Sequence, residues 1–234
     1  MARRRRNWQH HGDLMTISNA INNVQISQVN LVVIAVSGSY TPPSNLLWAD
    51  IECVGGGAGS GGVNTTGPTT KSISAGGGAG GFSRVSATRS QLAPSTSITI
   101  GSGGAGGAPG VNDGVAGGTT IVGSLCQATG GLGSSGGVAL TTYTIKIGQS
   151  AGSGSGGDVN TDGASGLNSY QGDSSRPVLE PQAGGASYFG GGGFGSAGIQ
   201  GGGGGGVGNP PSTAAQAGLS GGDGLVVITE YLSK

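Results

Sequence analysis

Glycine dominates this chain, and its distribution limits what the chain can fold into. The 234 residues include 56 glycines, of which only Gly12 and Gly38 precede residue 55. Glycine supplies no side chain for chemistry, adds little apolar surface to a core and loses more backbone entropy on ordering than any other residue. The segment after residue 54 must therefore be disordered or be held by hydrogen bonds between closely packed backbones.

Composition alone favours disorder, because 56 glycines and nine prolines without a strict repeat are typical of low-complexity chains. Collagen is excluded, since glycine does not recur at every third position. We expect order instead. Chains without Cβ atoms can pack side by side as extended, polyglycine II-like strands with three residues per turn, each bonded to its neighbours.

The charge of the chain is unevenly distributed. The formal net charge is zero, but residues 1–13 carry four arginines against Asp13, a charge of +3, and the remainder therefore carries −3. We interpret residues 1–13 as a basic arm that docks on a neighbouring subunit. Binding to nucleic acid, which clustered guanidinium groups would favour, and no specific role are the alternatives. The arm's candidate docking residues are Arg3, Arg4, Arg5, Arg6 and Trp8.

Neither a membrane span nor a secretion signal is expected. No run approaches 18 apolar residues, and the N-terminal arginines are followed by polar residues where a signal peptide has its apolar region. The two cysteines, Cys53 and Cys126, each lie in a short apolar segment typical of a strand. We predict two buried free thiols, since two cysteines are too few for a disulfide scaffold.

Strand-like segments bracket and punctuate the glycine tracts. Residues 14–28 have apolar residues at helical spacing, so a short helix is an option there, and residues 38–45 are typical of a turn. Segments rich in β-branched residues predict strands. These lie at residues 29–37, 46–54, 82–87, 95–100, 119–122, 125–128, 140–147 and 224–232.

We therefore expect a mostly β chain with two parts. Residues 1–28 form the basic arm and attachment segment, and residues 29–234 form a glycine-rich β domain. A chain that closes with a strong strand is expected to return beside its early strands. The prediction is a small antiparallel β-sheet or sandwich as a platform, from which the glycine tracts project as loops or as bundled polyglycine II-like strands.

The order of these segments resembles a known family. Tyr40-Thr41-Pro42-Pro43 precedes the strand at 46–54 and the run Gly55-Gly56-Gly57-Ala58-Gly59. There follow AGGGAGGFSRV (75–85), SITIGSGGAGG (97–107), GGTTIVG (117–123), ATGGLGSSGG (128–137) and the closing GDGLVVITEY (222–231). This series, over residues 36–231, resembles the glycine-rich domain of bacteriophage tail-fibre, tail-tip and related virion proteins, including adhesins that stack polyglycine II strands.

The resemblance implies a non-enzymatic virion structural protein, a tail-fibre or tail-tip component involved in host attachment. It implies other virion subunits and a host surface receptor as partners, a homotrimer as the oligomer, and a place in the phage particle after synthesis in the host cytoplasm. A capsid decoration or head-fibre protein, anchored by the basic arm, is the alternative. A shell component that contacts nucleic acid and an ice-binding polyglycine protein are less favoured.

Motifs of catalysis and cofactor binding have weak support. The G-x-G-x-x-G match at 101–106 lacks a following helix, and the only histidines, which a serine hydrolase at 133–137 would need, lie in the arm. We expect no catalytic residue and no cofactor. Asp158, Asn160 and Asp162 match the first half of a calcium loop but lack its twelfth ligand. A plain turn is the favoured interpretation of these three residues, and a calcium site is the alternative.

Three aromatic residues stand out in a stretch with few other large side chains: Tyr188, Phe189 and Phe194. We favour the interpretation that they fill the gap where the glycine strands meet the β platform. The alternative is that they contact a sugar or a protein at the surface.

Overall fold

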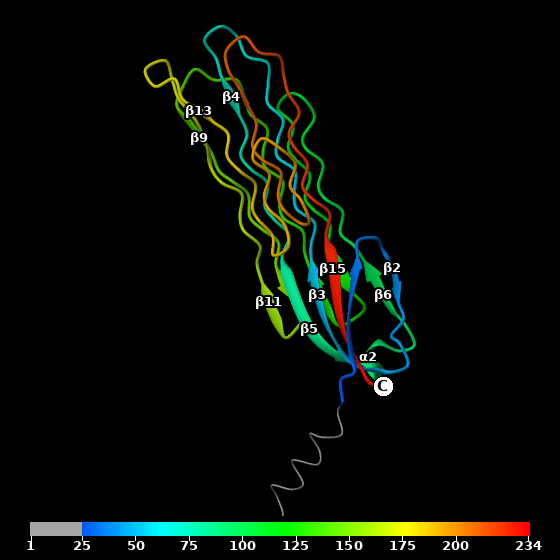
Figure 1. The fold of residues 1–234 in the computed structure, drawn as a ribbon. Helices are drawn as coiled ribbons and strands as arrows, with labels where there is room; N and C mark the ends of the chain where they lie inside the picture. Colours follow the sequence, from blue (N-terminus) through cyan, green and yellow to red (C-terminus); the bar gives the residue numbers. More distant parts are fainter. Residues whose placement is uncertain (1–24) are drawn as a thin grey trace, which may run out of the picture.

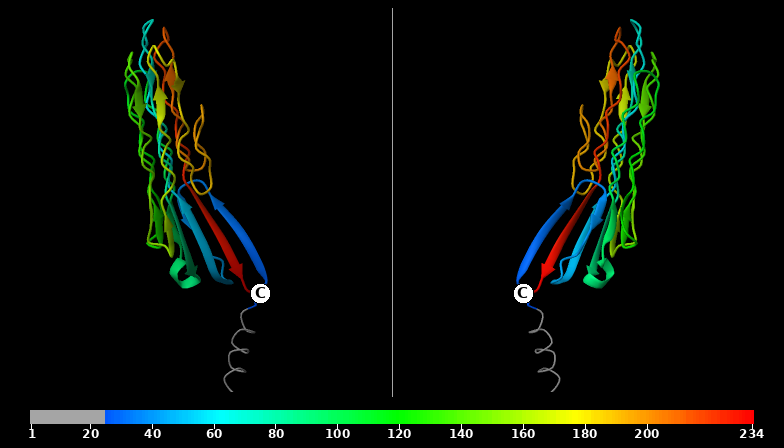
Figure 2. Two further views of the ribbon diagram at one scale, coloured as in Figure 1. Left: turned by 90° about the vertical axis from the view of Figure 1, so that its left-hand side faces the viewer. Right: turned by 90° about the vertical axis from the view of Figure 1, so that its right-hand side faces the viewer.

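The computed structural model describes residues 25–234. Strand and helix make up 31% and 2% of it, so the chain is nearly all β, as predicted. Two five-stranded antiparallel sheets stand at one end, and long glycine-rich segments run away from them side by side (Figures 1 and 2). We call the two sheets together the platform and the glycine-rich segments the bundle.

The main sheet of the platform has the order β1-β15-β3-β5-β11, and the second sheet has the order β10-β8-β7-β6-β2. A three-stranded distal sheet (β13-β12-β9) and a pair (β14-β4) lie toward the other end (Figure 1). The elements are β1 (Gln28–Ile34), β2 (Gly38–Tyr40), β3 (Leu46–Val54), β4 (Ser72–Ile73), β5 (Phe82–Thr88), α2 (Arg89–Leu92), β6 (Thr96–Thr99), β7 (Thr120–Val122), β8 (Cys126–Ala128), β9 (Thr144–Lys146), β10 (Gly154–Ser155), β11 (Val159–Thr161), β12 (Ser169–Gln171), β13 (Leu179–Glu180), β14 (Gly208–Asn209) and β15 (Leu225–Leu232).

The long strands agree with the sequence prediction, and the closing strand does return to the early ones, since β15 pairs with both β1 and β3. The prediction of a turn over residues 38–45 was wrong in part. Residues 38–40 form β2, which pairs with β6. The short strands β4 and β10–β14 were not predicted, because two or three residues are too few to show an alternating pattern.

The core lies between the two platform sheets. Ile51 and Ile228 from the main sheet pack in one cluster with Ile98 and Val122 from the second sheet, and all four are buried. The alternation of β3, in which Ala49, Ile51 and Cys53 are fully buried, places one face of that strand in this core. The predicted sandwich is therefore confirmed for the platform.

The bundle is held by backbone hydrogen bonds with a period of three residues. Along residues 55–60, successive amide groups donate to three different segments in rotation, and each segment is met again three residues later. The pairs are Gly55 to Gly81 and Ala58 to Gly78, Gly56 to Gly118 and Gly59 to Val115, and Gly57 to Gly222 and Ser60 to Leu219. Three residues per turn is the periodicity expected of the polyglycine II-like form.

The carbonyl groups of the same strand point to three further segments. The oxygens of Gly56, Gly57 and Ala58 accept from the amides of Gly131, Gly104 and Gly204, at N–O distances of 3.1, 2.8 and 2.8 Å. Residues 55–63 are thus surrounded by hydrogen-bonded neighbours on all sides. The glycine tracts form bundled polyglycine II-like strands rather than loose loops, and their buried amides and carbonyls are satisfied without a β-sheet.

Close packing explains why these positions are glycine. A Cβ atom added to Gly56 or Gly59 would lie 2.2 or 2.0 Å from the carbonyl oxygen of a neighbouring segment. At Gly203 it would lie 2.1 Å from the oxygen of Gly77. Because the obstructing atoms belong to backbone, the clash cannot be relieved by turning a side chain.

A buried hydrogen bond ties the two platform sheets together. The hydroxyl of Tyr40 (β2) donates to Glu230 Oε1 (β15) at 2.6 Å, and Asn30 Nδ2 (β1) donates to Glu230 Oε2 at 3.2 Å. Both Tyr40 and Glu230 are buried. Burial, the hydrogen bond to Glu230 and the charge of that carboxylate all raise the pKa of Tyr40.

The bundle predicts a large penalty for a single methyl group. We expect Gly203→Ala to lower the melting temperature by roughly 5–10 °C, because overpacking costs about 1–3 kcal/mol where the neighbours cannot move. Gly191→Ala is the matched control, since a Cβ atom at Gly191 meets nothing within 4 Å. Thermal unfolding followed by circular dichroism measures both. Equal melting temperatures for the two variants would contradict tight packing at Gly203.

The Tyr40–Glu230 pair predicts a stability loss at high pH. Tyr40 keeps its proton in the folded state, whereas an unfolded tyrosine loses it near pH 10, so its contribution is complete below about pH 10 and falls as the pH rises further. We expect Tyr40→Phe to destabilise the protein by about 1.5–3 kcal/mol at neutral pH, because the buried Glu230 carboxylate loses one of its two side-chain donors. The variant should also lose less stability than the wild type above pH 10. Denaturant titrations across pH test this, and parallel alkaline slopes would refute it.

Candidate functional site

The distal sheet brings large side chains back into a chain that is otherwise mostly glycine. In its register Ile145 (β9), Tyr170 (β12) and Glu180 (β13) lie directly opposite one another. Opposite residues of antiparallel strands share one face of the sheet. The β-branched and aromatic residues of 140–147 explain why a strand forms here, between glycine tracts.

One face of the distal sheet carries several exposed apolar side chains, with the exposed Glu180 at its edge. Tyr143 and Ile147 lie two residues on either side of Ile145, and all three are exposed, Ile147 to 67%. Val178, which precedes β13, is exposed as well. We call Tyr143, Ile145, Ile147, Tyr170 and Val178 the distal face. Contiguous exposed apolar side chains often mark an interaction surface, so this face is the candidate binding site.

The opposite face of the distal sheet is fixed to the bundle. Ser169 and Gln171 alternate with Tyr170 and are buried. Gln171 Nε2 donates to Leu140 O at 3.1 Å, and Ser169 Oγ accepts from the amide of Gln182 at 3.0 Å. Lys146 Nζ donates to Gly136 O at 3.0 Å. The distal face therefore rests on a rigid support.

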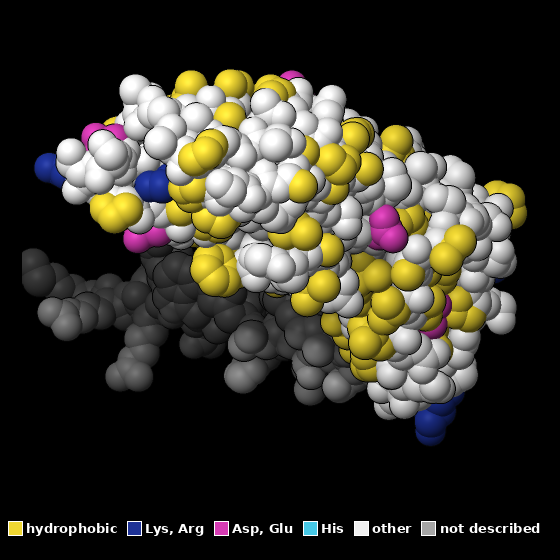
Figure 3. Space-filling model, turned by 90° about the horizontal axis from the view of Figure 1, so that it is seen from above, with side chains coloured by type: hydrophobic (Ala, Val, Ile, Leu, Met, Phe, Trp, Pro, Cys, Tyr) yellow, Lys and Arg dark blue, Asp and Glu magenta, His cyan; other side chains and the backbone are white. Residues whose placement is uncertain are grey.

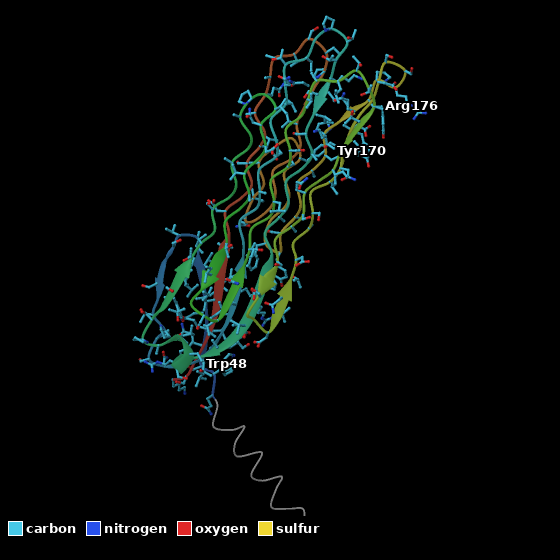
Figure 4. The ribbon with its side chains drawn as sticks, turned by 180° about the vertical axis from the view of Figure 1, so that it is seen from behind. Trp48, Tyr170 and Arg176 are labelled. Carbon is cyan, nitrogen blue, oxygen red and sulfur yellow. The ribbon has the colours of Figure 1, made fainter. Side chains whose placement is uncertain are left out.

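The turn between β12 and β13 adds a positive charge at the rim. Asp173 Oδ1 accepts from the amides of Ser175 and Arg176 at 2.8 and 2.9 Å, which fixes the turn. The Arg176 side chain is exposed and projects at the distal end beside Tyr170 (Figure 4). Viewed from this end, the surface carries scattered apolar side chains and few charged ones (Figure 3).

A second apolar surface lies at the opposite end of the molecule, on the outer face of the main sheet. Val29, Leu31 and Val33 alternate along the edge strand β1 and are exposed to 55%, 66% and 58%. In the row of Val29, Trp48 (β3) and Tyr231 (β15) stack with ring centroids 4.6 Å apart. Figure 4 shows Trp48 at the platform end, far from Tyr170. We call these five residues the platform face.

The polar side of the same face carries the one salt bridge found among residues 25–234. Arg84 Nη2 donates to Asp50 Oδ2 at 2.8 Å. Burial raises the pKa of Asp50, but hydrogen bonds from Ser86 and Arg84 and the charge of Arg84 outweigh it, so the pKa lies below the usual range. Asp50 therefore stays ionised at neutral pH, and the outer face of the main sheet is divided into an apolar and a charged half.

The candidate calcium residues have protein partners. Residues 159–161 form β11 at the edge of the main sheet, paired with β5. Asp158 Oδ2 accepts from the amide of Ser86 at 2.9 Å, and Asn160 Oδ1 accepts from Ser83 Oγ at 2.7 Å. In the described part of the chain, no group of three or more His, Cys, Asp or Glu side chains could hold a metal ion. Calcium binding by Asp158, Asn160 and Asp162 stays a prediction that these contacts do not support.

The three aromatic residues separate into a pair and a single residue. Tyr188 stacks on Phe82 with centroids 3.9 Å apart, and Phe189 meets both rings edge to face. Phe82 begins β5, where the bundle joins the platform, so Tyr188 and Phe189 lie at the junction that the sequence analysis favoured. Tyr188 nevertheless remains 61% exposed. Phe194 is 71% exposed and contacts neither of them, so it remains a candidate for surface contact.

The arm residues Arg3, Arg4, Arg5, Arg6 and Trp8 lie outside the described residues, as does most of the segment assigned to a helix. The two cysteines are buried and free, as predicted. Sequence analysis missed the distal and platform faces as sites. Alternating apolar residues in 29–33 and 143–147 were a signal, but alternation does not say which face is covered.

Comparison with known proteins identifies the domain family of the chain. No helix of residues 25–234 is long and apolar enough to cross a membrane. No curated protein matches the chain. The family model described as a glycine-rich domain matches residues 34–231, which is most of the chain and includes the bundle, the distal sheet and all of the platform except most of β1 and the last residue of β15. The chain therefore belongs to the glycine-rich domain family.

Proposed function

We propose that this chain is a non-enzymatic structural protein of a bacteriophage particle, a tail-fibre or tail-tip component that takes part in host attachment. The observation that supports this most directly is the separation of two exposed apolar faces by a rigid bundle. The platform face lies at one end and the distal face at the other (Figure 4). A protein that links a particle to a surface needs two contact sites held at a fixed distance.

The bundle suits this role because it is stiff and chemically sparse. Its strands are bonded to neighbours on several sides, and most of the described glycines have backbone atoms where a side chain would be. A bundle of this kind bends little and therefore holds its two ends at a fixed distance. In this proposal the platform side, which carries the first described strand β1, faces the particle, and the distal face contacts the host.

Residues 25–234 offer few side chains that could act as catalytic groups. Both histidines, His10 and His11, precede this range, and the buried carboxylate Glu230 is held by Tyr40 and Asn30 inside the platform. The exposed groups of the distal face and its rim are apolar or aromatic, with one cation at Arg176 and one carboxylate at Glu180. These groups suit binding to a receptor. The homotrimer and the partner subunits implied by the family resemblance belong to the same proposal.

Location on the particle is the first expected outcome. We expect immunogold electron microscopy of intact phage particles, with antibody raised against this chain, to label the tail end. Label over the head would favour a decoration or head-fibre protein and would refute the attachment role. The absence of label on any particle would refute the assignment to the virion. Antibody pre-absorbed with the purified chain is the control for specificity.

The distal face generates a second expected outcome. We expect the double variant Tyr143→Ser and Ile147→Ser to reduce binding of the purified chain to host cells at least about tenfold, because apolar anchors carry much of the energy of an interface. The matched control is Val115→Ser with Leu132→Ser, two residues of the bundle that are about equally exposed (55% and 51%). Flow cytometry with labelled protein measures binding, and circular dichroism confirms folding. Equal binding by the two double variants would exclude the distal face as the contact site.

A further inference from the structure

The two cysteines, which the sequence separates by 73 positions, meet in the core of the platform. Cys53 lies in β3 of the main sheet, and Cys126 begins β8 of the second sheet. Their Sγ atoms are 3.6 Å apart, and both residues are buried. Cys53 has no exposed surface, and Cys126 is 4% exposed. The chain has no other cysteine. Each thiol is therefore the nearest redox partner of the other.

We propose that Cys53 and Cys126 form an intersheet disulfide when the protein meets a low-molecular-weight disulfide. A disulfide bond is about 2.05 Å long, so the two sulfur atoms must approach each other by about 1.5 Å. The surrounding cluster is built of aliphatic side chains, and the two residues sit on facing sheets with both sulfur atoms directed into the same space. A small rotation of the two side chains is the movement required.

The surroundings of Cys126 provide a route for the oxidant. Cys126 lines an open pocket together with Gly123, Ser124 and Gly156, at the turn between β7 and β8. Two of these neighbours are glycines, which leave the pocket open beside Cys126. Cys53 lies behind Cys126 and has no exposure of its own. The geometry therefore makes Cys126 the attacking thiol and Cys53 the resolving thiol.

The two thiols share one hydrogen bond, in which either sulfur atom can donate. That hydrogen bond and burial raise the pKa of Cys53. Attack on the small disulfide requires the thiolate of Cys126, since the thiolate and not the thiol is the nucleophile.

The reaction balances as two thiol–disulfide exchanges. The Cys126 thiolate attacks one sulfur of the small disulfide, breaks its S–S bond, and releases one small thiol as a mixed disulfide forms on Cys126. The Cys53 sulfur then attacks the Cys126 sulfur, loses its proton to the leaving group and displaces the second small thiol. The protein is oxidised by two electrons, and one small disulfide is reduced to two thiols.

The disulfide would bind the two sheets covalently and close a loop of more than 70 residues between positions 53 and 126. Cross-links that close loops of this length restrict the unfolded chain. For a protein of this size, the expected rise in melting temperature is roughly 10 °C. The Tyr40–Glu230 hydrogen bond already joins the same two sheets, so the cross-link would reinforce an existing contact and not create a new one.

The test uses the full-length wild-type protein, reduced with a phosphine and then equilibrated with oxidised glutathione. We expect an intact mass lower by two hydrogen atoms, no reaction with maleimide after denaturation, and the higher melting temperature. Two free thiols in the folded, glutathione-treated protein would overturn the proposal. A stable glutathione adduct on Cys126 would overturn it too, since Cys53 would then be unable to resolve the mixed disulfide.

Cys53→Ala and Cys126→Ala are the control variants. Neither can form the intramolecular bond, so glutathione treatment should leave their melting temperatures unchanged, and only Cys53→Ala should accumulate a mixed disulfide. If either variant folds poorly, the wild-type measurements of mass, labelling and melting temperature decide the question by themselves. A rise in melting temperature that persists in Cys53→Ala would assign the stabilisation to another cause and refute the cross-link.

Discussion

The hydrogen bond between backbone groups of neighbouring glycine segments is the interaction on which this structure depends. In the strand at 55–60 the amide groups serve three segments in rotation and the carbonyl groups serve three others. The arrangement is open only to residues without side chains, because added Cβ atoms would lie about 2 Å from a neighbour's carbonyl oxygen. Glycine has the largest entropic cost of ordering, but because it has no side chain it is also the residue that permits this dense backbone packing.

The platform solves the opposite problem with side chains. A backbone-bonded bundle has ends at which the segments must turn, and the platform gathers them into two sheets over an aliphatic core. Phe82 lies where the bundle joins the platform, because it is the first residue of β5. Its ring stacks on the ring of Tyr188 next to the glycine-rich segments. The buried Tyr40–Glu230 hydrogen bond and the cysteine pair both cross between the two sheets. Apolar packing alone does not specify how the two sheets align, and these two contacts add that specification.

The bundle and the two ends of the molecule differ in the side chains that they offer for binding. The interior of the bundle is filled by backbone, so few side chains there are free to recognise anything. Exposed apolar side chains are spread along the molecule, but on the distal face and the platform face they lie on the strands of a sheet. The proposed attachment role uses these two faces and requires no chemistry from the body between them.

The sequence by itself determined the mostly β class, the long strands β3, β5 and β15, the return of the last strand to the first, and the burial of both cysteines. The class, the strands and the buried cysteines follow from local composition, since β-branched and apolar runs are visible in neighbouring residues. The return of the last strand follows from the general expectation that a chain with a strong closing strand pairs it with its early strands. Only the tertiary structure decided that Gly38–Tyr40 pairs with β6, that residues 159–161 form an edge strand whose side chains bond to β5, and that Cys53 meets Cys126. It also decided which alternating faces remain exposed. The physical reason is that all of these depend on contacts between segments far apart in the chain, and glycine tracts carry no side-chain pattern from which their neighbours could be identified.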